Sequence, residues 1–146
     1  MTKWDDAYVQ TAQIFAQLSS ARRAKVGAVI VKDNRILSVG YNGMPSGWDN
    51  ECEDEYLYED GGTELKTKPE VLHAEANAIT KVARSTESSE GSTLYTTMLP
   101  CLDCAKLIYQ AGIERVVYRD SYPKGTAGLE FLEKCCVSVE PYEANT

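Results

Sequence analysis

The chain has 146 residues, of which 43% are hydrophobic and 25% are charged, the usual composition of a globular domain. A chain of this length buries about 68–70% of the surface that its unfolded form exposes, so it needs no disulfides to fold. Its net charge of −7 argues against a broad basic surface for DNA or RNA, and no apolar run approaches the about 20 residues of a membrane-spanning helix.

Helix-like and strand-like segments alternate along the chain, which indicates an α/β fold. Residues 4–19 have apolar side chains close to helical spacing, with acids in the first turn, and predict a helix. Residues 26–31 and 36–41 are short apolar runs around a polar turn, so we expect a β-hairpin. No repeat or linker divides the chain, and we therefore expect one domain over residues 1–146.

The stretch from Gly43 to Lys68 shows no sustained periodicity. It is rich in Gly, Asp and Glu, and it predicts a long loop with a short helical piece. Loops of this length are usually functional. Its acidic part, residues 49–60, is expected to be a solvated loop, with a contact at an interface as the alternative.

The second half of the chain returns to regular elements. Pro69 is suited to open a helix that continues to about Arg84. A strand, a helix that ends before Gly112, a second strand, a helix and a last strand are then expected over residues 93–98, 101–111, 115–118, 126–134 and 137–141.

The only histidine of the chain and a Cys-x-x-Cys segment together predict a zinc site. The candidate ligands are His73, Cys101 and Cys104. Three protein ligands leave the fourth tetrahedral position to a water molecule, whose pKa zinc lowers to about 7. We expect His73 in the first turns of one helix and Cys101 at the start of the next, where the positive helix end favours a thiolate.

Glu75, two residues after the histidine, is the candidate proton carrier between this water and a substrate. The arrangement H-x-E followed by P-C-x-x-C is typical of zinc-dependent nucleobase deaminases. Each half alone is weak evidence, because Cys-x-x-Cys also serves in redox and structural zinc sites. Together they favour a catalytic site, since a structural site would need a fourth ligand and none is evident.

The start of the chain favours a cytoplasmic protein, and the three remaining cysteines are expected to have no role in the metal site. Cys135 and Cys136 lie in an apolar stretch and are expected to be buried hydrophobic residues. A second zinc site at Cys52 would need histidines that the chain lacks. Met1–Asp6 has no apolar core of the kind that signal peptides carry.

A small basic cluster spans residues 22–25, and it leaves two interpretations open. One or two well-placed cations are enough to bind a phosphate, and the cluster offers two arginines and a lysine. It could equally be a solvated surface patch.

Taken together, these segments resemble the deoxycytidylate deaminases over most of the chain. The matching segments, in the order of that family, are residues 26–29, 40–47, 73–79 and 100–106. The metal segments are shared with all cytidine deaminase relatives, whereas Gly-Tyr-Asn-Gly at residues 40–43 is the specific one. The resemblance implies a cytidine-deaminase-like three-layer α/β/α fold with a central five-stranded mixed sheet, one catalytic zinc per subunit, and hydrolysis of dCMP to dUMP and ammonia, which supplies dTMP synthesis.

The resemblance also implies substrate-binding residues. Arg23 matches a phosphate-binding arginine, and Asn42 matches an asparagine that contacts sugar and base. Ala74 would offer its backbone N–H to the pyrimidine carbonyl. Tyr122 matches a tyrosine that lies against the substrate, with an ordinary surface tyrosine as the alternative.

Regulation and assembly are likewise implied by the resemblance alone. Many relatives are homo-hexamers that dCTP activates and dTTP inhibits, with Mg²⁺, at an interface site that would include Tyr41, Asn42 and Gly43. Some members hold a second zinc through additional His and Cys, and the only histidine here is already used.

Three other functions fit parts of the pattern. A tRNA adenosine deaminase shares the metal pattern, but an acidic chain is poorly suited to a polyanion. A free cytidine or deoxycytidine deaminase would not need Arg23. A non-catalytic, zinc-stabilised module that senses nucleotides would keep zinc without turnover, and it would be insensitive to Glu75→Gln.

Overall fold

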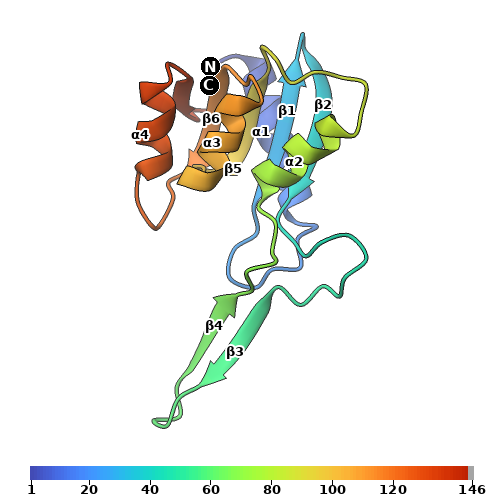
Figure 1. Ribbon diagram of the computed structural model, residues 1–146. Coiled ribbons are helices and arrows are strands. Elements are labelled where there is room, and N and C mark those ends of the chain that lie inside the picture. Colours follow the sequence, from blue (N-terminus) through green and yellow to red (C-terminus); the bar gives the residue numbers. More distant parts are fainter. Residues whose placement is uncertain (145–146) are drawn as a thin grey trace.

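The computed structural model describes residues 1–144, and its centre is a five-stranded sheet in the order β2-β1-β5-β6-β7 (Figure 1). The strands are β1 (Gly27–Lys32), β2 (Arg35–Tyr41), β5 (Thr93–Met98), β6 (Arg115–Asp120) and β7 (Ser138–Pro141). β1 pairs antiparallel with both β2 and β5, whereas β5, β6 and β7 are parallel. The predicted α/β fold with a central five-stranded mixed sheet is therefore confirmed.

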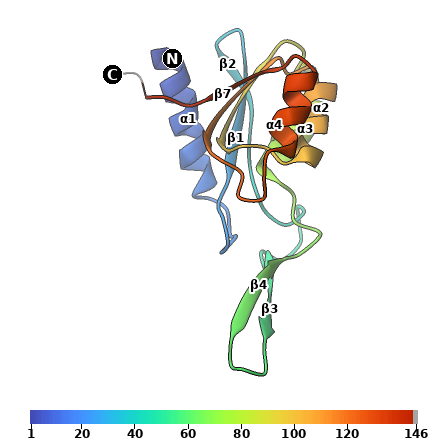
Figure 2. The same ribbon diagram turned by 90° about the vertical axis from the view of Figure 1, so that its left-hand side faces the viewer.

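Helices cover both faces of this sheet (Figure 2). α1 (Lys3–Ala16) lies on one face, and α2 (Ala74–Ala83), α3 (Leu102–Gln110) and α4 (Ala127–Lys134) lie on the other. β1 is apolar at consecutive positions because Val29 and Val31 face α1 while Ala28 and Ile30 face the other helices. Within residues 1–144, none of the helices combines the length and apolar character needed to cross a membrane.

The hairpin expected between β1 and β2 is present. Asp33 and Asn34 form its turn with φ angles of 50° and 58°. Two positive φ angles fit the tight hairpin turns in which Asn and Asp are favoured. Gly112 follows the end of α3, as the sequence predicts. Its φ angle of 81° is the left-handed conformation that glycine adopts after a helix.

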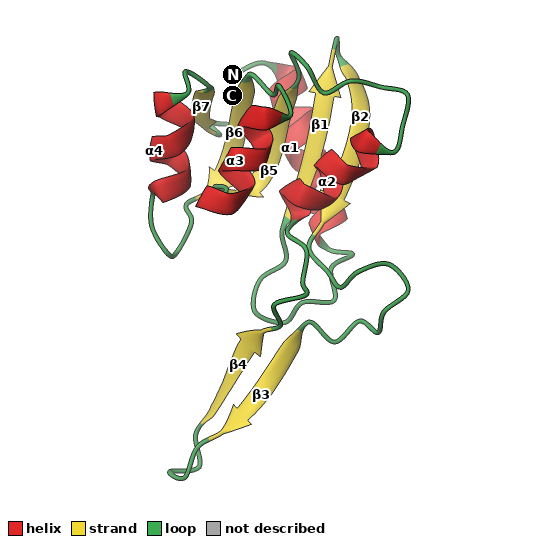
Figure 3. Ribbon diagram, viewed as in Figure 1, coloured by secondary structure: helices red, strands yellow, loops and turns green. Residues whose placement is uncertain are grey.

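The expectation of a long loop with a short helical piece over residues 43–68 is wrong. This segment contains a second hairpin, made of β3 (Glu53–Leu57) and β4 (Thr63–Thr67), that projects away from the helices and the main sheet (Figure 3). Nearly all of its side chains are exposed, so the sequence lacks the alternation of apolar and polar residues that marks a half-buried strand. Only its base, at Cys52 and Glu53, is buried.

The helix predicted from Pro69 begins later, at Ala74. Leu72 exchanges two backbone hydrogen bonds with Gly43, which holds this part of the chain extended. His73 is consequently the N-cap residue rather than part of the first turn. A smaller correction concerns Cys136, which is exposed with a φ angle of 62° after α4, whereas Cys135 is half-buried against the core.

The start of α1 is connected to three strands by an ionic network around the buried Asp5 carboxylate. The Asp5 carboxylate accepts hydrogen bonds from Tyr95 Oη at 2.6 Å and from Arg115 Nη1 at 2.9 Å. Arg115 Nε also donates to Glu140 on β7 at 2.7 Å. Burial alone would raise the pKa of the Asp5 carboxyl, but the hydrogen bonds from Arg115 and Tyr95 hold this pKa well below its usual range.

We expect Asp5→Asn to lower the free energy of unfolding at pH 7 by about 2–3 kcal/mol, because the charge that strengthens the hydrogen bonds from Tyr95 and Arg115 is lost. The folded-state pKa of Asp5 is lowered, so its contribution is present at neutral pH and is lost as the pH falls below about 4. Urea unfolding measures this: the difference in the free energy of unfolding between Asp5→Asn and the parent protein should be smaller at pH 3.5 than at pH 7. Glu87→Gln, which breaks the exposed ion pair with Arg35, is the control and should cost under about 0.5 kcal/mol.

Candidate active site

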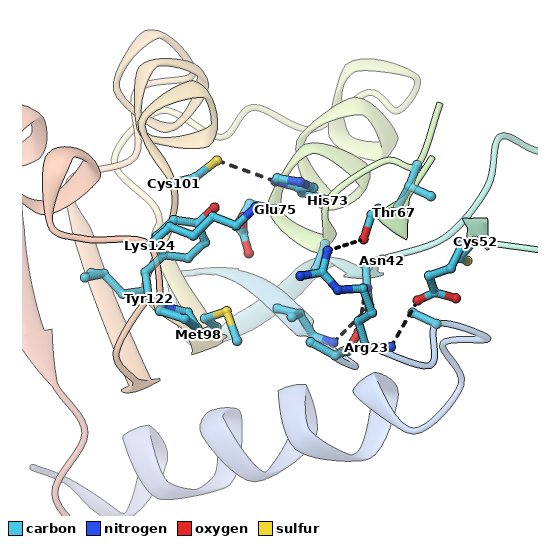
Figure 4. A pocket seen from close by; sticks show the side chains of 18 residues that line it. Arg23, Asn42, Cys52, Thr67, His73, Glu75, Met98, Cys101, Tyr122 and Lys124 are labelled. Atoms are coloured by element: carbon cyan, nitrogen blue, oxygen red, sulfur yellow. Dashed lines mark hydrogen bonds between the residues drawn. The ribbon is translucent and has the colours of Figure 1, made fainter. Parts of the chain in front are cut away.

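Two helix starts bring the three candidate metal ligands together. His73 is the N-cap of α2 and Cys101 the N-cap of α3, and neither side chain caps its own helix with a hydrogen bond. Both are therefore free to turn toward each other, as Figure 4 shows. His73 Nδ1 lies 3.5 Å from Cys101 Sγ and 3.4 Å from Cys104 Sγ.

This donor set fits zinc. A tetrahedral ion with ordinary Zn–N and Zn–S bonds would separate the nitrogen from each sulfur by about 3.6 Å, close to the distances in the structure. The three ligand atoms lie within 4.8 Å of one another, and in residues 1–144 no other side chain of a ligand type joins the group. Three ligands without a fourth are typical of a catalytic site.

Hydrogen bonds among the two thiols and the imidazole shift the pKa values of these groups. The pKa of Cys101 is lowered to about 4, because the Cys104 thiol and His73 form hydrogen bonds to its sulfur. The hydrogen bond to Cys101 raises the pKa of His73 in turn. A thiolate at the start of a helix is a strong ligand for a divalent cation, and metal coordination removes the proton from the second thiol as well.

Glu75 lies in the first turn of α2, beside these ligands, and is almost completely buried. Burial raises the pKa of its carboxyl. Thr96 Oγ1 lies 3.3 Å from Glu75 Oε1 and fixes the position of the carboxyl group. A buried carboxyl with a raised pKa takes up a proton more readily than an exposed one, which suits a group that must both accept and release protons.

A cleft of about 300 Å³ connects this cluster with the basic segment before β1. The four residues that the sequence assigns to the substrate all line it, and they are Arg23, Asn42, Ala74 and Tyr122. Figure 4 shows Arg23 across the cavity from Cys101 and Glu75. Of the residues expected at an effector site, Asn42 lines the cleft, whereas Tyr41 and Gly43 do not.

Hydrogen bonds fix the Arg23 end of the cleft. Arg23 Nη1 donates to Thr67 Oγ1 at 3.1 Å, at the base of the β3–β4 hairpin. The Asn42 side chain accepts from the backbone N–H of Val26 at 2.9 Å and donates to the carbonyl of Ala24 at 2.8 Å. Asn42 thus holds the segment that follows Arg23 in place.

Sequence reasoning missed several residues of the cleft wall. Cys52, Glu53 and Thr67 come from the hairpin base, and Lys124 comes from the loop that carries Tyr122. Lys124 could have been predicted to line the cleft, because it lies two residues after the candidate substrate residue Tyr122. The hairpin residues gave none, because only the fold brings them beside Arg23.

Known proteins share this fold and these segments. Residues 2–120 match the model of the family described as the cytidine and deoxycytidylate deaminase zinc-binding region. The deoxycytidylate deaminase of Enterobacteria phage T4 is 36% identical, over 84% of this chain and 80% of that protein. The human deoxycytidylate deaminase is 39% identical, over 88% of this chain and 74% of that protein.

A solved structure is similar over nearly the whole chain. It is the dCMP deaminase of cyanophage S-TIM5 in complex with dCMP and dUMP, with a TM-score of 0.86 and 46% identity over 97% of this chain and 99% of that one. A structure from a study of tRNA:A34 deaminases, at 24% identity and a TM-score of 0.64, shows a likeness in fold alone.

Proposed function

Because this chain belongs to the family with the cytidine and deoxycytidylate deaminase zinc-binding region, we propose that it hydrolyses dCMP to dUMP and ammonia. The observation that carries the proposal is one cleft lined by Arg23 and by the predicted zinc ligands His73 and Cys101. A nucleoside monophosphate has its phosphate and its base at opposite ends, and the cleft offers a partner for each. The dUMP product would supply dTMP synthesis, and we expect the reaction to take place in the cytoplasm.

His73, Cys101 and Cys104 would hold one zinc ion per chain. Bound zinc supplies a nucleophile at neutral pH, because it acidifies water. The fit of the donor distances to tetrahedral coordination supports this assignment.

Glu75 would carry the protons of the reaction. Its carboxylate takes a proton from the attacking water and delivers it to the ring nitrogen N3, and then assists the departure of the amine as ammonia. The buried position beside Cys104 and the raised pKa support this role, since the group must exchange protons in both directions. Ala74, the first residue of α2, lines the cleft and has a backbone N–H with no partner inside the helix, which would donate to the pyrimidine carbonyl.

Arg23 would bind the 5′-phosphate, and Tyr122 would lie against the nucleotide between phosphate and metal. Both side chains line the cleft. The phosphate contact is what favours a monophosphate over a free nucleoside. We expect Arg23→Gln to lower kcat/KM for dCMP by about 30–100-fold, through the loss of a charge-assisted hydrogen bond.

The same variant should leave the low turnover of deoxycytidine unchanged, because the nucleoside has no phosphate to lose. Steady-state kinetics with both substrates measures this. Lys25→Gln is the matched control. It also removes one positive charge, but Lys25 lies two residues after Arg23 and does not line the cleft. Equal losses in the two variants would show a general charge effect and refute the phosphate contact.

The overall activity can be tested by following ammonia release from dCMP, deoxycytidine and cytidine with the zinc-loaded protein. Turnover of dCMP far above that of deoxycytidine and cytidine supports the proposal. Equal turnover of deoxycytidine would indicate a free cytidine deaminase. Zinc retention without turnover of any of the three would indicate a nucleotide-sensing module.

Regulation by dCTP and dTTP with Mg²⁺, in a homo-hexamer, is a second part of the proposal. Its support is the position of residues 41–43: Asn42 lines the cleft, and Gly43 is bonded to the backbone of Leu72, next to His73. An effector that shifts residues 41–43 would change both the substrate cleft, through Asn42, and the metal-ligand end, through Leu72 and His73. The assay repeated with dCTP or dTTP and Mg²⁺, together with light scattering, tests activation, inhibition and subunit number.

A further inference from the structure

The wall of the cleft contains a buried carboxylate that the proposed mechanism leaves unused. The Glu53 side chain is 1% exposed, and its Oε2 accepts the backbone N–H groups of Arg22 at 2.8 Å and Arg23 at 3.0 Å. Its other oxygen, Oε1, is the one buried side-chain nitrogen or oxygen in residues 1–144 that has no hydrogen-bond partner. Buried polar atoms are nearly always hydrogen-bonded, so Oε1 marks a contact that a bound molecule can complete.

The charge of Glu53 defines what this contact can be. Arg22 Nε lies 3.7 Å from Oε1, which is within ion-pair distance but too long for a hydrogen bond. An ionised carboxylate has no proton to donate, so Oε1 can only accept a hydrogen bond. The missing partner is therefore a donor, and an anionic group would be repelled.

The position of Glu53 narrows the choice of donor further. Glu53 holds the backbone of Arg23 and so belongs to the phosphate end of the cleft, away from the zinc ligands. If the chain acts on dCMP as proposed, the phosphate lies at Arg23 and the amino group of the base lies at the metal. The donor of dCMP that lies between these two groups is the 3′-hydroxyl of the deoxyribose.

We propose that Glu53 binds the 3′-hydroxyl of the nucleotide and makes the enzyme specific for substrates in which this hydroxyl is free. The inference rests on the proposed function and extends it from the base and the phosphate to the sugar. It also excludes a class of molecules. A nucleotide with a 3′-phosphate, including every internal residue of a polynucleotide, would bring a negative charge against a buried carboxylate.

The test compares dCMP with 2′,3′-dideoxy-CMP, which lacks only this hydroxyl, on the zinc-loaded enzyme. We expect kcat/KM to be about 30–100-fold higher for dCMP, with most of the difference in KM, because a hydrogen bond to a charged group is lost. In Glu53→Gln the ratio should fall to about 5 or less, since the amide can keep its oxygen on the two backbone N–H groups and turn its NH₂ group toward the sugar.

Glu55→Gln is the matched control, because Glu55 lies two residues further along β3 with an exposed side chain outside the cleft wall. This variant should keep the ratio of the parent enzyme. Circular dichroism and zinc content establish that each variant is folded and loaded. Equal use of the two nucleotides by the parent enzyme, or an unchanged ratio in Glu53→Gln, would overturn the proposal.

Binding measured by calorimetry separates this inference from the proposed function. Absence of dCMP turnover by the zinc-loaded parent protein would refute the deaminase function. Even then, tighter binding of dCMP than of its dideoxy analogue, lost in Glu53→Gln, would support the 3′-hydroxyl contact. Equal affinities would refute it.

Discussion

Glu75→Gln should lower kcat for dCMP by about 10²–10⁴-fold while zinc content stays at about one ion per chain. Glutamine matches glutamate in size and can still accept from Thr96 Oγ1, which lies 3.3 Å from Glu75 Oε1. It cannot accept and return a proton, so the loss falls on the chemical step and KM for dCMP should change little. Steady-state kinetics together with metal analysis of the purified variant measures both quantities.

Glu70→Gln is the appropriate control for this experiment. Glu70 lies in the turn before α2 and is exposed, so the same change of charge is made nearby without touching the cleft. We expect its activity to equal that of the parent enzyme. If Glu75→Gln were to retain more than about a tenth of the parent kcat, a proton carrier other than Glu75 would have to be found.

Cys104→Ala should abolish both zinc binding and turnover. The Cys104 side chain is buried in the first turn of α3, 3.4 Å from His73 Nδ1, and solvent cannot readily take its place as a ligand. With His73 and Cys101 alone, the affinity for zinc should fall by at least about 100-fold, and the loss in kcat/KM should exceed about 10³-fold. Elemental analysis after dialysis gives the zinc content.

Thermal unfolding gives an independent check on the same variant. A ligand that binds only the folded state raises the melting temperature, so added zinc should raise Tm for the metal-free parent protein and leave Cys104→Ala nearly unchanged. Cys136→Ser is the control, because Cys136 is exposed and lies outside the metal cluster. A zinc-dependent Tm in Cys104→Ala equal to that of the parent would contradict the ligand assignment.

The stability of the core and the chemistry of the cleft depend on different parts of this fold. The Asp5 network joins α1 to β5, β6 and β7 through Tyr95 and Arg115, and none of these three residues lines the cleft. The cleft depends instead on the starts of α2 and α3 and on the base of the β3–β4 hairpin. Asp5→Asn is therefore expected to lower stability at neutral pH without lowering the activity of the folded enzyme.

The sequence by itself determined the elements of the central sheet and the candidate ligands of a metal site, His73, Cys101 and Cys104. β5 runs over residues 93–98 as predicted, because its β-branched and aromatic residues are typical of a strand and are visible locally. The ligands were equally visible, since the only histidine and a Cys-x-x-Cys pair have few other uses in one short chain. Both inferences needed only spacing along the chain.

The tertiary structure alone decided the β3–β4 hairpin, the late start of α2 and the place of Glu53. The hairpin strands expose nearly all their side chains, so their pairing leaves no periodicity to read. α2 starts at Ala74 because Leu72 is bonded to Gly43, far away along the chain. Glu53 sits in an acidic stretch that predicts a solvated surface, and it is buried because the fold brings it against the backbone of Arg23. Contacts between distant segments decide such positions, and local sequence carries no record of them.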